Sequence, residues 1–155
     1  MTDGHITAVL NRLLQVVNRT LPMYFSDVPP YIARGDESAI ETLRQIVAEQ
    51  QSLCRRINDL ILEKRSRVDM GEFPMEFTGL NDCSLEYLLG RMIEYQRRDI
   101  KTIEQCVEQL HQDPRAKALA EETLGVFRGH LESLEELQRK PGAAALPFPE
   151  PASSP

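Results

Sequence analysis

Apolar residues recur at steps of three and four along four stretches of this chain, and that spacing places them on one face of an α-helix. Helix-breaking residues separate the stretches, most clearly Pro29-Pro30 and Asp113-Pro114. The pattern predicts an all-α protein with four helices: about Ile6 to Tyr24, Asp36 to about Val68, Asp82 or Ser84 to about His111, and Asp113-Pro114 through Leu137.

Two of the links between these helices are short. The segment from Val28 to Gly35 leaves room only for an antiparallel return. At Asp113-Pro114 an N-cap residue is followed directly by a proline suited to the first helical position. The first and second helices, and the third and fourth, are therefore predicted to be antiparallel neighbours.

The link from Gly71 to Asn81 is longer, and its apolar residues alternate with polar ones or proline, as in an extended segment with one packed face: Phe73, Met75 and Phe77. About a dozen extended residues span roughly 36–40 Å. A helix of about 27 residues is roughly 40 Å long. This match predicts a crossover along a four-helix bundle, with the second and third helices parallel. The alternative is a loop packed over one end of a simpler bundle.

Composition narrows the function classes. The 155 residues carry a net charge of -6 and a pI near 5.1, which disfavours nucleic-acid binding. No apolar run approaches the roughly 18 residues that a membrane span needs, and the first residues lack the pattern of a signal peptide. Cys54, Cys83 and Cys106 form no CxxC pair or zinc pattern. We expect a cytoplasmic protein with reduced thiols and no membrane partner.

The composition changes after Lys140. Residues 1–140 are predicted to form the bundle, and residues 141–155 a disordered Pro/Ala-rich tail. Within this tail, Leu146-Pro147-Phe148-Pro149 is an apolar island shaped like a short docking peptide. It is a candidate contact for a protein partner, beside the simpler interpretation as a solvated terminus.

Helix lengths, the short first link, the apolar crossover and the Asp113-Pro114 restart together resemble the ferritin-like superfamily, over about residues 5–138. The resemblance is one of architecture. It implies a di-metal centre of iron or manganese at mid-bundle. In that family the first and third helices each give a Glu, and the second and fourth each give Glu-x-x-His.

This chain departs from that ligand pattern. The residues at the centres of the four apolar stripes are Val17, Gln50, Gln96 and Phe127. Three residues after Gln50 stands Leu53, and three after Phe127 stands His130, so only His130 remains as a plausible ligand. The carboxylates that would offset two divalent cations are missing, so we expect the di-metal site to be lost and no cofactor to be bound.

Gln50 and Gln96 would still need hydrogen-bond partners if both lie in the core. We predict that they hydrogen-bond each other across neighbouring helices. They would form a core polar layer that Asp99 and His130 complete, with Thr20 or Thr123 as further members.

Two functions of different class follow. The first is a non-catalytic ferritin-like bundle with an interaction or assembly role, as a homodimer. The alternative is a metal-dependent oxidoreductase or iron-handling protein, which would need the unusual ligands His130, Asp99, Glu94 and Glu49. The two functions differ in whether these carboxylates converge inside the bundle. A register shift of one position on the second and third helices would turn Glu49 and the neighbourhood of Glu94 toward the centre.

Overall fold

The computed structural model describes residues 3–27 and 37–139. All regular structure in these ranges is helical, as the apolar periodicity predicts. The elements are α1 (Asp3–Asn18), α2 (Leu21–Asp27), α3 (Glu37–Glu63), the 3-10 helix η1 (Met75–Leu80), α4 (Leu85–Gln109) and α5 (Pro114–Arg139). No helix of this described part is both long and apolar enough to cross a bilayer. The predicted tail, with its apolar island, lies outside the described residues.

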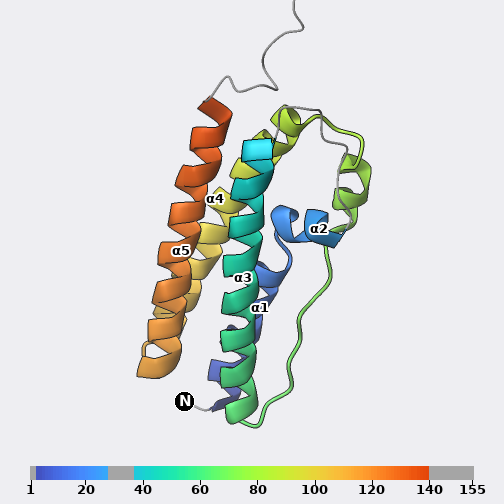
Figure 1. Ribbon diagram of the computed structural model, residues 1–155. Coiled ribbons are helices and arrows are strands. Elements are labelled where there is room, and N and C mark those ends of the chain that lie inside the picture. The colour runs from blue at the N-terminus through green and yellow to red at the C-terminus, as the bar shows by residue number, and fades with distance from the viewer. Residues whose placement is uncertain (1–2, 28–36, 140–155) are drawn as a thin grey trace, which may run out of the picture.

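The four longest helices lie side by side, and Figure 1 shows α3 and α4 running in one direction while α1 and α5 run in the other. Helix α1 packs against α3 and α4, and α5 packs against the same two helices. Helices α3 and α4 are therefore diagonal to each other. Two clusters of buried apolar side chains fill the interior, one toward each end of the molecule.

The first predicted helix is interrupted. It was expected to continue to Tyr24, but α1 ends at Asn18 and α2 begins at Leu21 in a new direction (Figure 1). Pro22 lacks the N–H that a continuous helix would use and its ring would collide with the carbonyl of Asn18. Thr20 caps the new helix, because its Oγ1 accepts a hydrogen bond of 3.3 Å from the backbone N–H of Met23.

Helix α3 ends at Glu63, five residues before the predicted end at Val68. Arg65 adopts the left-handed conformation, with φ of 59°. The N–H of Arg65 donates to the carbonyl of Leu62 (2.9 Å) and the N–H of Ser66 donates to that of Ile61 (3.2 Å). These two bonds form a Schellman motif, which satisfies carbonyls at the helix end and turns the chain.

After α3 the chain returns along α1 before it enters η1 and α4 (Figure 1). Three amide side chains of α1 hold the returning backbone. Asn11 donates to the carbonyl of Arg67 (2.9 Å) and accepts from the N–H of Asp69 (2.7 Å). Gln15 and Asn18 donate to the carbonyls of Asp69 and Met70, both at 3.3 Å. We call Asn11, Gln15 and Asn18 the amide ladder.

The expectation of one packed face over Phe73, Met75 and Phe77 is wrong in part. Phe77 is 2% exposed, but Met75 is 83% exposed. The reason is that residues 75–80 form a 3-10 helix, with about three residues per turn, instead of an extended segment with a period of two.

The predicted starts of the last two long helices are close to those observed. Ser84 caps α4 by accepting from the N–H of Tyr87 (3.1 Å). Asp113 caps α5 by accepting from the N–H of Ala116 (3.1 Å), with Pro114 as the first helical residue. Asp113 also forms an ion pair of 2.6 Å with Lys64, which joins the start of α5 to the end of α3.

Candidate functional site

A chain of hydrogen bonds crosses the middle of the interior and has Gln50 at its centre. The Thr20 hydroxyl at the α1–α2 break donates to Oε1 of Gln50 on α3 (2.6 Å). Nε2 of Gln50 lies 3.3 Å from Nδ1 of His130 on α5. Thr20, Gln50 and His130 are all buried. Each polar atom of Gln50 therefore has a partner, which removes the cost of burying the amide.

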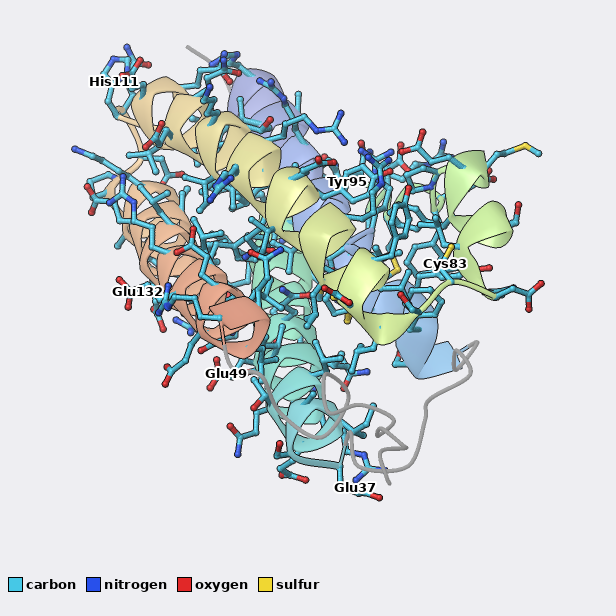
Figure 2. All side chains as sticks on the ribbon, turned by 90° about the horizontal axis from the view of Figure 1, so that it is seen from above. Glu37, Glu49, Cys83, Tyr95, His111 and Glu132 are labelled. Carbon is cyan, nitrogen blue, oxygen red and sulfur yellow. The ribbon has the colours of Figure 1, made fainter. Side chains whose placement is uncertain are left out.

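This line of hydrogen bonds reaches the surface through His130 and Glu49. Nε2 of His130 lies 2.6 Å from Oε1 of Glu49, whose side chain is 61% exposed while that of His130 is 6% exposed. Figure 2 shows Glu49 on the part of α3 that lies beside α5. The consistent arrangement is a neutral imidazole that donates from Nε2 to the carboxylate and accepts the Gln50 amide at Nδ1. Burial lowers the pKa of His130, and this outweighs the opposite effect of the hydrogen bond with Glu49.

Gln96 belongs to a separate contact. Its Nε2 donates to the backbone carbonyl of Phe127 on α5 (3.0 Å). The predicted hydrogen bond between Gln50 and Gln96 is not formed, because α3 and α4 lie diagonally and each amide finds its partner elsewhere. Thr123 does not join either contact, since its hydroxyl donates to the carbonyl of Leu119 in its own helix (2.8 Å).

Asp99 lies outside the Gln50 chain. It is half-buried on α4, in the wall of a cavity of about 190 Å³ that Arg19 and Thr20 also line. Burial raises the pKa of Asp99 to about 7, against the weaker opposing effects of Arg98 and Arg19. The predicted core polar layer is therefore divided. Gln50 and His130 are linked by a hydrogen bond, Gln96 bonds to the backbone of α5, and Asp99 lines the cavity of about 190 Å³ instead.

The alternative ligand set does not converge. Glu94 is exposed and pairs with Arg91 of its own helix (2.7 Å), away from both Asp99 and His130. Only Glu49 and His130 come into contact. Within residues 3–27 and 37–139, no three His, Cys, Asp or Glu side chains are grouped closely enough to hold a metal ion. At the centres of the four apolar stripes, Val17 and Phe127 are fully buried, and so is Gln50, while Gln96 is 2% exposed.

Sequence reasoning missed a cluster around Tyr95. Its hydroxyl donates to Glu76 of η1 and accepts a hydrogen bond of 2.6 Å from Arg91. The guanidinium groups of Arg91 and Arg98 lie 4.8 and 4.6 Å from the ring centroid. Burial raises the pKa of Tyr95, as does the hydrogen bond to Glu76. The spacing of Arg91, Tyr95 and Arg98 at i, i+4 and i+7 was the available signal, because it puts them on one helix face.

An apolar groove of about 530 Å³ lies where α2, α3 and α4 meet. Its lining includes Pro22, Phe25, Leu43, Val47, Leu85 and Met92, and Arg44 stands among them. The groove lies beyond the end of α1 at Asn18, where α3 and α4 continue without it. Such a surface can bury apolar side chains of another protein segment.

Comparison of the chain with known protein families, with curated proteins and with solved structures gives no match.

Proposed function

We propose that this protein is a ferritin-like four-helix bundle without di-metal chemistry, and that it acts by assembly through a homodimer. The architecture is supported by the single long crossover and by the parallel direction of α3 and α4, which is the arrangement expected of ferritin-like bundles.

The observation that carries the proposal is the composition of the interior at mid-height. Val17 and Phe127 are fully buried there, and the amides of Gln50 and Gln96 are hydrogen-bonded to other protein groups. Hard divalent cations bind to converging carboxylates. Among the described residues, the carboxylate that contacts this line of hydrogen bonds is that of Glu49, whose side chain is 61% exposed and hydrogen-bonded to His130.

The assembly role rests on the apolar groove, for which we propose a second copy of this chain as the occupant. Its rim on α3 carries both charges, since Glu41 and Arg44 are exposed and lie 3.8 Å apart. In a two-fold contact between α3 helices, Arg44 of each copy would meet Glu41 of the other, so the surface is complementary to itself. The apolar residues between α3 and α4 would then be buried.

The test of assembly is the molar mass of the full chain by light scattering, together with a matched pair of variants. Leu43→Glu places a charge in the groove, whereas Leu62→Glu places one on the same helix at a side chain that is already 54% exposed. We expect a dimer for the wild type and for Leu62→Glu, and a monomer for Leu43→Glu. A monomeric wild type, or equal effects of the two variants, would refute the homodimer.

The metal part of the proposal has its own test. Elemental analysis of protein purified without chelator, followed by anaerobic Fe(II) titration, should give no saturable binding. Stoichiometric iron or manganese that is lost in His130→Ala would contradict the proposal and restore the oxidoreductase alternative, with Glu49 and His130 as the first ligands to examine.

A further inference from the structure

A second feature of the molecule is independent of its assembly: the cavity of about 190 Å³ where α1 ends, α4 passes and the crossover enters η1. Its polar wall consists of Arg19, Thr20, Glu76, Tyr95, Arg98 and Asp99. Figure 2 shows nitrogen- and oxygen-bearing side chains gathered around Tyr95, between α4 and η1. Three segments that are distant in sequence therefore contribute polar groups to one small space.

Asp99 is one acceptor of this cavity. In the described part of the chain it forms no hydrogen bond and no ion pair, although Arg19 and Arg98 are near enough to act on its charge. Asp99 thus presents a partly desolvated carboxyl group whose hydrogen-bonding capacity is unused by the protein.

Two arginines supply donors, and both are held in place. Nε of Arg19 donates to the carbonyl of Gln15 (3.2 Å). Gly71, with φ of 72°, lets the crossover pack closely on Arg19, because a Cβ there would lie 3.1 Å from its Cδ. Arg98 is held over the ring of Tyr95 at 4.6 Å. Among the described residues, the terminal nitrogens of Arg19 and the guanidinium of Arg98 have no hydrogen-bond acceptor.

The two hydroxyl groups of the wall already have hydrogen-bond partners within the protein. The Tyr95 hydroxyl is bonded to Glu76 and Arg91. The Thr20 hydroxyl donates to Gln50 and accepts from Met23. The groups left for a ligand are thus the carboxyl group of Asp99, Oε1 of the exposed Glu76, and the guanidinium nitrogens of Arg19 and Arg98. Of the two acceptors, Asp99 is the more buried.

We propose that this cavity binds a small carboxylate with a hydrogen-bond donor on the adjacent carbon, that is, an α-amino or α-hydroxy acid. The ligand carboxylate would bind to Arg19 and Arg98, which suit planar oxyanions. The neighbouring amine or hydroxyl would donate to Asp99. The cavity of about 190 Å³ holds roughly six water-sized groups, a size that suits alanine, serine or lactate.

The experiment is a titration of the full chain, followed by NMR chemical shifts of backbone amides near Asp99, with alanine, serine and lactate. Acetate lacks the donor, and ethylamine lacks the carboxylate. We expect saturable binding of one or more of the substituted acids, at least tenfold tighter than that of acetate and ethylamine. If alanine and serine bind and lactate does not, the ligand is an amino acid; the reverse identifies a hydroxy acid.

Three variants assign the roles. Arg98→Gln should weaken binding at least tenfold, and Asp99→Ala should abolish the preference over acetate. Arg97→Gln is the matched control, because Arg97 is the adjacent residue but pairs with Glu135 on α5 (2.8 Å), and it should bind like the wild type. Absence of saturation in the wild type, equal binding of acetate, or equal effects of Arg97→Gln and Arg98→Gln would overturn the proposal. Because Arg98 is exposed, its variant remains informative even if Asp99→Ala fails to fold.

Discussion

Replacement of Gln50 by Leu should destabilise the protein although it makes the interior more apolar. Gln50 is fully buried and has two partners, the Thr20 hydroxyl at 2.6 Å and Nδ1 of His130 at 3.3 Å. Leu would leave the first without its acceptor and the second without its donor. Each such group costs about 1–3 kcal/mol, so the loss is about 2–6 kcal/mol before compensation.

The added apolar burial offsets part of this loss, by about 1–2 kcal/mol for a Leu side chain. Taking the middle of each range, the expected net decrease in the free energy of unfolding is about 2–3 kcal/mol. For a chain of this size each kcal/mol shifts Tm by about 2–4 °C. The measurement is urea unfolding by circular dichroism at pH 7.5, with thermal unfolding as a second readout. Gln45→Leu is the control, since Gln45 is an exposed residue of the same helix.

A double-mutant cycle separates the Gln50–His130 contact from general effects of size. His130→Phe removes the acceptor, so Gln50→Leu should cost less in that background, with a coupling free energy of about 0.5–3 kcal/mol. An unchanged or raised stability of Gln50→Leu would refute the reasoning, as would additive effects of the two substitutions.

Three further predictions concern other parts of the molecule. Burial raises the pKa of Asp99 from an ordinary value of 3.8 to about 7, so the folded protein binds this proton more tightly than the unfolded chain does. The resulting contribution to stability is fully present below pH 3.8 and is lost as pH rises through about 7. Wild type should therefore lose about 1–3 kcal/mol of the free energy of unfolding between pH 5.5 and 8.5 relative to Asp99→Asn, measured by urea unfolding. The charged and titratable groups that line the same cavity are Arg19, Arg98, Glu76 and Tyr95. Identical pH profiles of the two proteins would contradict this prediction. Arg65→Gly should raise stability by about 0.5–1 kcal/mol, since glycine adopts the left-handed conformation without strain; a decrease in the urea midpoint would count against the Schellman end of α3. Asn11→Ala should accelerate hydrogen exchange of the Asp69 amide, which donates to Asn11, whereas Asn58→Ala on α3 should leave that rate unchanged; equal rates in both variants would argue against the amide ladder.

The sequence predicted those elements whose causes are local. Asp113-Pro114 carries both an N-cap and a preferred first helical residue, and the helix starts there. The break after Asn18 was also readable, because Thr20 and Pro22 together form a start signal that the apolar stripe concealed. The end of α3 was not readable, since arginine rarely adopts the left-handed conformation that it has at position 65.

The site was predictable in its members but not in its partners. Burial of Gln50, Gln96 and His130 follows from helical periodicity. Which of them meet depends on which helices are adjacent, and this is set by long-range packing that one stripe does not encode. For the same reason the half-buried Asp99 was assigned to the wrong side of α4, although it is only three residues from Gln96.

The amide ladder has a consequence for the order of folding. Its hydrogen bonds join residues 52 to 58 positions apart, whereas α4 and α5 are joined by a turn of a few residues. Closing the short turn costs little chain entropy and closing the long loop costs more. We expect the α4–α5 hairpin to form early and the crossover to dock late, after α1 is helical enough to align its three amides. Until that step the chain after Glu63 has no guide along α1, and the direction in which α4 joins α3 is still open.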